Sequence, residues 1–149
     1  MVSADTNVFV YSLDPRAPAK QATAKIIVAA LIERRALVGL QCAGELQNAL
    51  RRKLGFAHDQ AARLARDLLV RFDTFPPTET AAFHALGDLE AGVGSYFDRL
   101  LIRSAAESGC TAFLTEDRQD RRRIEGVEIV PPFEPGGDLS ARAREVLEL

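Results

Sequence analysis

The chain is poor in the residues that small proteins use as covalent or metal staples. Its 149 residues include two cysteines, Cys42 and Cys110, and two histidines, none with the spacing of a zinc site. We therefore expect free, buried thiols and a reducing compartment. A single domain of this length can bury a core large enough to fold without such staples.

Long apolar runs are absent as well. No stretch approaches the roughly 20 residues that a transmembrane helix needs, and the first residues lack the cationic segment of a signal peptide. The sequence therefore predicts a cytoplasmic protein with no membrane partner. Repeats, low-complexity tracts and the glycine-rich loops of mononucleotide or dinucleotide sites are missing too.

An excess of charge of one sign is also missing. Nineteen Lys and Arg against 21 Asp and Glu give a net charge of −2, so bulk charge does not indicate a nucleic-acid partner. The cations nevertheless cluster, and arginine suits phosphate because its guanidinium presents paired donors. For any one cluster alone, a solvated helix face is the simpler explanation. The clusters are Arg51, Arg52 and Lys53; Arg63, Arg66 and Arg71; and Arg118 with Arg121, Arg122 and Arg123.

What is present is an alternation of short apolar runs and amphipathic segments. Strands are expected at residues 2–4, 36–40, 111–114 and 127–130, with 72–75 as either a strand or a connector. Helices are expected at residues 7–13, 19–34, 42–54, 58–72, 78–90, 97–108 and 139–147. This order is typical of an α/β fold in which helices cover both faces of a parallel sheet.

Four acidic residues that are far apart in the chain should meet at one edge of that sheet. In a parallel sheet the strands end, and the following helices begin, at the same edge, where ligands bind. Asp5 and Asp117 each follow a predicted strand, whereas Glu45 and Asp98 lie in the first turns of predicted helices. A structural role is possible for each, because Asp5 could cap a helix, Glu45 and Asp98 could complement helix dipoles, and Asp117 could hold a turn.

Asp98 fits a purely structural role least well. It falls within the apolar stripe of its helix, where a carboxylate is unfavourable unless it is paired or bound to a metal. Arg99 and Arg103 are expected at the side of that stripe, so neither is an obvious partner. Four converging carboxylates repel one another, and the usual compensation is a hard divalent cation such as Mg²⁺ or Mn²⁺.

The same acids lie in motifs of a known family. The motifs are Asp5-Thr6-Asn7-Val8-Phe9-Val10-Tyr11, Gly44-Glu45-Leu46, Ser95-Tyr96-Phe97-Asp98-Arg99-Leu100-Leu101-Ile102, Leu114-Thr115-Glu116-Asp117, and Gly126-Val127 leading to Pro132-Phe133. In this order and spacing they resemble PIN-domain proteins, above all the VapC-type ribonuclease toxins of type II toxin–antitoxin pairs. The resemblance covers residues 1–133. It implies a Rossmann-like α/β domain with a short parallel central sheet between helices, followed by an extension at residues 134–149.

The resemblance also implies an activity and its residues. The chain would be an Mg²⁺- or Mn²⁺-dependent endoribonuclease that forms homodimers and is inhibited by a small antitoxin protein. Asp5, Glu45, Asp98 and Asp117 would be the catalytic acids, with Asp5, Asp98 and Asp117 as metal ligands. Asn7, Thr115, Glu116 and Asp120 would be supporting residues, although Glu116 competes with Asp117 for the role of last ligand. We expect the RNA backbone to be bound by Arg118, Arg121, Arg122 and Arg123.

Other functions stay open at this point. A PIN-like module could bind RNA or protein without catalysis, or an RNA-processing nuclease could act without an antitoxin. A phosphotransferase of the haloacid dehalogenase type would need a second aspartate two residues after Asp5, where Asn7 stands. A response-regulator receiver would need a late lysine, and none follows Lys53.

Overall fold

A computed structural model describes residues 1–117 and 122–149, and its strands form two groups. The larger sheet has the order β1-β4-β6-β5, with β1 (Val2–Ala4), β4 (Ala112–Leu114) and β6 (Val127–Val130) parallel. The smaller sheet pairs β2 (Leu37–Gly39) with β3 (Asp73–Phe75), also in parallel. The predicted parallel α/β architecture is confirmed, and the ambiguous segment at 72–75 contains a strand.

One strand was not predicted. β5 (Arg123–Ile124) is antiparallel to β6 and is joined to it by a two-residue turn at Glu125 and Gly126. Both turn residues have positive φ, 49° and 82°, which is the backbone of a type I′ hairpin. A two-residue strand is too short to show any periodicity in the sequence.

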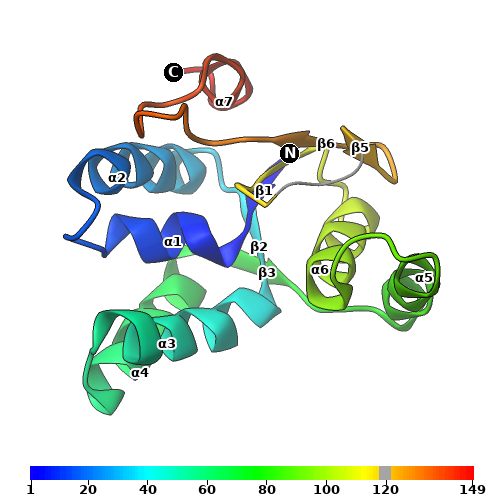
Figure 1. Ribbon diagram of the computed structural model, residues 1–149, viewed down its shortest axis with the longest axis horizontal. Helices are drawn as coiled ribbons and strands as arrows, with labels where there is room; N and C mark the ends of the chain where they lie inside the picture. The colour runs from blue at the N-terminus through cyan, green and yellow to red at the C-terminus, as the bar shows by residue number, and fades with distance from the viewer. Residues whose placement is uncertain (118–121) are drawn as a thin grey trace.

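Helices cover both sides of the strands, as expected. α1 (Thr6–Ser12) and α2 (Pro18–Glu33) lie on one side, and α5 (Glu79–Glu90) and α6 (Tyr96–Glu107) lie on the other (Figure 1). α3 (Leu40–Leu54) and α4 (His58–Arg71) form an antiparallel pair beside them. α3 ends at Gly55, whose φ of 70° is the left-handed conformation typical of a helix end.

The core lies between these layers and explains why such short strands are stable. Large apolar side chains that are almost fully buried come from every layer: Val8, Ile27, Leu31, Val38, Leu50, Ile102, Phe113, Leu114, Val127 and Val130. Burying each one contributes roughly 1.5–3 kcal/mol. The two cysteines are free and buried, as the sequence predicts.

The last segment packs on the same core. α7 (Ala141–Leu147) lies over α2 and buries Ala143 and Leu147, and Ser140 caps it through a 3.0 Å hydrogen bond from the Ala143 N–H. Arg34, which directly follows α2, donates to the Leu147 carbonyl at 2.6 Å. Among the described residues, no helix has the length and apolarity to cross a bilayer.

The topology singles out one edge of the large sheet. From β1 the chain passes through α1 and α2 to the β2–β3 pair, which lies next to β1, whereas β4 pairs with the other edge of β1. Successive connections therefore diverge at the carboxyl end of β1. In open α/β sheets a crevice forms at such a point.

Candidate functional site

Asp5 lies at the carboxyl end of β1, where the successive connections of the chain diverge. Its N–H continues the β1–β4 ladder by donating to the Leu114 carbonyl at 3.0 Å. Its Oδ1 accepts hydrogen bonds from the N–H groups of Asn7 and Val8, at 3.0 and 3.4 Å, so Asp5 does cap α1. Its Oδ2 accepts a 2.5 Å hydrogen bond from the Thr115 hydroxyl. Only 7% of Asp5 is exposed.

Burial strongly affects the protonation of this carboxyl. Loss of solvent raises the pKa of Asp5 to about 7, the Thr115 hydrogen bond opposes the rise, and the negative charge of Asp117 adds to it. Without a cation nearby, this carboxyl therefore keeps its proton to a higher pH than an ordinary aspartate. Strongly perturbed pKa values cluster at functional sites.

Thr115 links the first and last of the predicted acids. Its hydroxyl donates to Asp5 and accepts the N–H of Asp117 at 3.0 Å. Partial desolvation raises the pKa of Asp117, the charges of Asp98 and Glu116 raise it further, and the charge of Lys53 lowers it.

Glu116 is occupied elsewhere. Its carboxylate pairs with the Lys20 ammonium at 2.5 Å, and Lys20 also lies 3.3 Å from the Tyr11 hydroxyl and 4.4 Å from the centre of the Tyr11 ring. Asp117 lines a pocket that Asp5 also lines, whereas Glu116 does not line it. This placement favours Asp117 over Glu116 as the last acid of the site.

Glu45 and Asp98 reach the same place from two helices. Glu45 lies in the second turn of α3 and accepts hydrogen bonds from the Thr6 hydroxyl and, at 2.5 Å, from the Gln41 amide. Asp98 lies in the first turn of α6, where Ser95 caps the helix: the Ser95 hydroxyl accepts the Asp98 N–H at 3.3 Å and donates to its carboxylate at 2.5 Å. These hydrogen bonds are sufficient to explain where Glu45 and Asp98 lie without a bound cation. Both residues nevertheless line the pocket.

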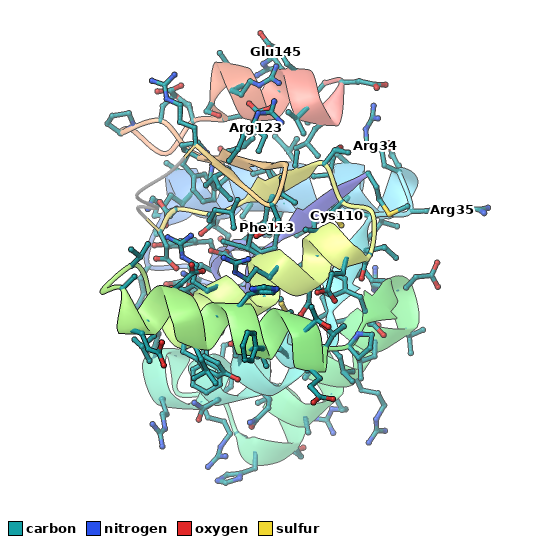
Figure 2. All side chains as sticks on the ribbon, turned by 90° about the vertical axis from the view of Figure 1, so that its right-hand side faces the viewer. Arg34, Arg35, Cys110, Phe113, Arg123 and Glu145 are labelled. Carbon is teal, nitrogen blue, oxygen red and sulfur yellow. The ribbon has the colours of Figure 1, made fainter. Side chains whose placement is uncertain are left out.

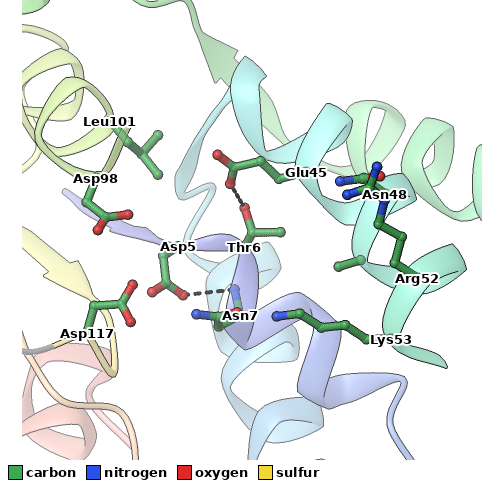
Figure 3. A pocket seen from close by; sticks show the side chains of 11 residues that line it. Asp5, Thr6, Asn7, Glu45, Asn48, Arg52, Lys53, Asp98, Leu101 and Asp117 are labelled. Carbon is green, nitrogen blue, oxygen red and sulfur yellow. Dashed lines mark hydrogen bonds between the residues drawn. The ribbon is translucent and has the colours of Figure 1, made fainter. Parts of the chain in front are cut away.

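The four predicted acids line one pocket of about 330 Å³. In Figure 3 the carboxylates of Asp5, Asp98 and Asp117 point toward one another, and Glu45 lies above Thr6, to which it is hydrogen-bonded. The remaining lining residues are Thr6, Asn7, Asn48, Ala49, Arg52, Lys53 and Leu101. Residues from four separate segments thus converge at the predicted edge.

The donor set is that of a hard cation. Within residues 1–117 and 122–149, no group of three or more Asp, Glu, His or Cys side chains is arranged closely enough to hold an ion by itself. Mg²⁺ does not require such a cage, because it usually takes one or two carboxylates and keeps several waters. The all-oxygen set and the raised pKa values of Asp5 and Asp117 fit a hydrated Mg²⁺ or Mn²⁺.

Sequence reasoning missed three polar residues of the pocket. Asn48, Arg52 and Lys53 follow Glu45 on α3 at intervals of three, seven and eight residues, which places all four on one helix face. The spacing is visible in the sequence, but the sequence alone singles out Arg52 and Lys53 only as part of the cationic cluster at residues 51–53.

Two of the four predicted RNA-binding arginines, Arg122 and Arg123, lie within the described residues, and neither lines the pocket. Arg123 donates to the Gly126 carbonyl at 3.0 Å and lies 3.6 Å from Glu128, in a cleft shared with Met1 and Val2 at the amino ends of the strands. Figure 2 shows it below α7. Arg122 is exposed. Arg118, Asp120 and Arg121 lie outside the described residues.

Arg99 is buried, which the sequence did not indicate, and its carboxylate neighbour is Asp88 rather than Asp98. Arg99 is 2% exposed, and its Nε lies 4.0 Å from the Asp88 carboxylate, which Arg103 also binds at 2.9 Å. The loop before α6 crosses the guanidinium at Gly94, where φ is 68° and a Cβ would lie 2.6 Å from Arg99 Nε. The start of α6, and with it Asp98, is thus anchored to α5.

Comparisons with known proteins agree with this geometry. The model of the PIN domain family matches residues 3–127. No curated protein sequence matches the chain. Among solved structures, the chain is similar to one in the crystal structure of VapBC2 from Rickettsia felis bound to a DNA fragment from their promoter, with a TM-score of 0.61 and 15% identity over 87% of this chain and 97% of that one. At that identity the likeness concerns the fold.

Proposed function

This chain belongs to the PIN-domain family, and on that premise we propose that it is an endoribonuclease that uses Mg²⁺ or Mn²⁺ to hydrolyse RNA phosphodiester bonds. The observation that carries the proposal is the pocket in which Asp5, Glu45, Asp98 and Asp117 meet. A protein that only bound a partner would gain nothing from the mutual repulsion of these groups.

Each polar side chain of the pocket would have a separate role in this reaction. Asp5, Asp98 and Asp117 would hold the cation, and Thr115 would orient Asp5 while fixing the backbone of Asp117. When bound, a divalent cation would lower the pKa of an attacking water and offset charge on the phosphate. Glu45 keeps its carboxylate at the pocket through donors from Thr6 and Gln41, and would orient that water.

The biological setting proposed for this activity is a toxin–antitoxin pair in the cytoplasm. VapC-like motifs run through the chain, and the fold resembles a chain of the VapBC2 structure. We propose that a small antitoxin protein inhibits the nuclease and that the nuclease forms a homodimer. An RNA-processing nuclease without an antitoxin is the second candidate, and the two differ in whether a neighbouring reading frame encodes a small DNA-binding protein.

The proposal is tested by incubating the purified chain with single-stranded RNA in Mg²⁺, in Mn²⁺ and in EDTA. Cleavage should require the metal and should be abolished in Asp5→Asn and Asp98→Asn. Undiminished cleavage in EDTA would exclude metal-dependent hydrolysis. Metal binding without cleavage of any RNA would instead identify a non-catalytic binding module.

A further inference from the structure

The pocket has two walls of opposite charge. Asp5, Asp98 and Asp117 form one wall, and the carboxyl-terminal half of α3 contributes Asn48, Arg52 and Lys53 on the other side (Figure 3). We propose that Asn48, Arg52 and Lys53, here called the α3 wall, bind backbone phosphates of the RNA strand next to the phosphate held at the acids. This inference rests on the proposed ribonuclease function and adds a second set of RNA-binding residues to the predicted arginines.

A nuclease pocket of this composition needs such a wall. Four carboxylates carry up to four negative charges, and one or two divalent cations offset only two to four of them. RNA is itself a polyanion, so the acids and their cations together provide little net attraction for the strand. The attraction must come from cations that are close to the acids but not consumed by them.

Arg52 and Lys53 meet this requirement. Neither side chain forms a hydrogen bond or an ion pair with another residue of the described ranges, and both are exposed in the pocket. Other cations nearby are already engaged: Arg16 pairs with Asp14 at 2.9 Å, and Lys20 pairs with Glu116. Exposed cations that form no hydrogen bond or ion pair within the described residues are available to a phosphate.

A simpler role is stabilisation of the helix end, because cations in the last turn complement the helix dipole. That role explains Arg51, Arg52 and Lys53 equally, yet Arg51 points to the His58 ring at 3.0 Å and does not line the pocket. It also gives no reason for Asn48, an uncharged residue one turn earlier on the same face. An amide that faces the pocket can donate to a phosphate oxygen.

The test measures RNA binding separately from RNA cleavage. Fluorescence anisotropy of a labelled single-stranded RNA is followed in Mg²⁺ over a series of KCl concentrations, with every variant carrying Asp98→Asn so that the probe stays intact. The test variant adds Arg52→Gln and Lys53→Gln. The matched control adds Arg66→Gln and Arg144→Gln, two exposed cations that do not line the pocket. A third variant, Arg52→Lys with Lys53→Arg, preserves both charges.

Loss of the two α3 cations should weaken binding roughly tenfold at low salt, and the slope of log affinity against log salt should fall by about 1.4, or 0.7 per lost contact. The control should keep the slope of the parent, and the charge-preserving variant should recover most of the affinity. A slope that changes equally in the test and control variants, or no RNA binding by the parent, would overturn the proposal.

The two proposals fail in different ways. RNA binding with the expected slope, but no cleavage by the chain with Asp98 intact, would contradict the nuclease and leave the α3 wall standing. Metal-dependent cleavage together with binding that is indifferent to Arg52 and Lys53 would contradict the α3 wall alone.

Discussion

The two ends of the parallel strands use the same kinds of side chain in opposite ways. At the amino ends, Glu128 accepts two 2.8 Å hydrogen bonds from Arg142 and lies 3.6 Å from Arg123. Arg142 holds the pKa of Glu128 below its usual value. At the carboxyl ends, Asp5 and Asp117 have no such partner among the described residues, and the pKa of each is raised.

The difference separates carboxylates that are satisfied by partners within the fold from carboxylates that are not. Paired surface charges are satisfied by one another and attract no further ion, although each pair contributes little energy. Carboxylates held together without a cation make the folded state less stable. Such an arrangement is expected where a ligand supplies the missing charge.

The largest expected effect is on RNA cleavage. Asp98→Asn should reduce the rate more than about 100-fold, because even residues that merely support metal ligands contribute 10- to 100-fold. Glu128→Gln, the matched change at the amino ends, should stay within about twofold of the parent. Single-turnover digestion in Mg²⁺ measures both cleavage rates. An equal loss of rate in the two variants would contradict a functional difference between the two ends of the sheet.

The next effect is on the pH dependence of Mg²⁺ binding. Because the folded-state pKa of Asp5 is about 7, a proton occupies this carboxyl at lower pH and competes with the cation. Mg²⁺ affinity should therefore rise roughly 10- to 30-fold between about pH 5.5 and about pH 7.5. The Mg²⁺ concentration that half-saturates thermal stabilisation measures it, and an affinity that is flat over this range would contradict a protonated Asp5.

The raised pKa of Asp5 also makes the stability of the fold depend on pH. Since the folded pKa of Asp5 lies above the ordinary value of 3.8, its contribution to stability is complete below that value and is lost as the pH rises through about 7. In EDTA, the stability contributed by Asp5 should therefore fall as the pH rises from 3.8 to about 7 and stay constant above that. Glu128 behaves oppositely, because its lowered pKa contributes stability that is lost on acidification.

A smaller effect on cleavage is expected at Lys20, where a paired carboxylate lies next to an unpaired one. Lys20 pairs with Glu116 and keeps it out of the pocket, next to the unpaired Asp117. Lys20→Met should free Glu116 to compete for the cation and lower cleavage roughly threefold to tenfold. In a Glu116→Gln background the same change should have little effect, and additive losses in the double variant would show that Lys20 acts by another route.

The smallest effect is on thermal stability. Asp117→Asn should raise the melting temperature in EDTA by about 1–2 °C, because it removes repulsion that exposure to solvent already screens. Glu128→Gln should lower the melting temperature by a similar amount, since it breaks a pair. Differential scanning calorimetry in EDTA measures both. A clear drop for Asp117→Asn would reveal a structural partner for this carboxylate.

Much of the site could be predicted because it follows from chain order. Asp5 directly follows β1, and Asp117 follows the end of β4 by three residues. The parallel topology brings strand ends together whatever their distance in sequence. Asp98 lies in the first turn of α6 at the pocket, as the sequence predicts, but it is only half-buried and its carboxylate bonds to Ser95 instead of lying in the core. The outcome for function was the same.

The rest depends on packing between elements that are not neighbours in sequence. Arg99 is buried because α5 supplies Asp88 across the helix pair, and no pattern within α6 reveals that partner. Likewise, the sequence shows Arg52 and Lys53 as one of several cationic clusters. Only the packing of α3 against α1 places this cluster, rather than Arg123, at the pocket of the acids.

Calorimetric titration with Mn²⁺ at neutral to slightly alkaline pH tests most directly whether the unpaired carboxylates are a cation site. The parent chain should show saturable binding that is lost in Asp5→Asn and in Asp98→Asn and is unchanged in Glu128→Gln. Binding that survives both aspartate substitutions, or no binding by the parent at all, would contradict the assignment of this edge of the sheet as a metal centre.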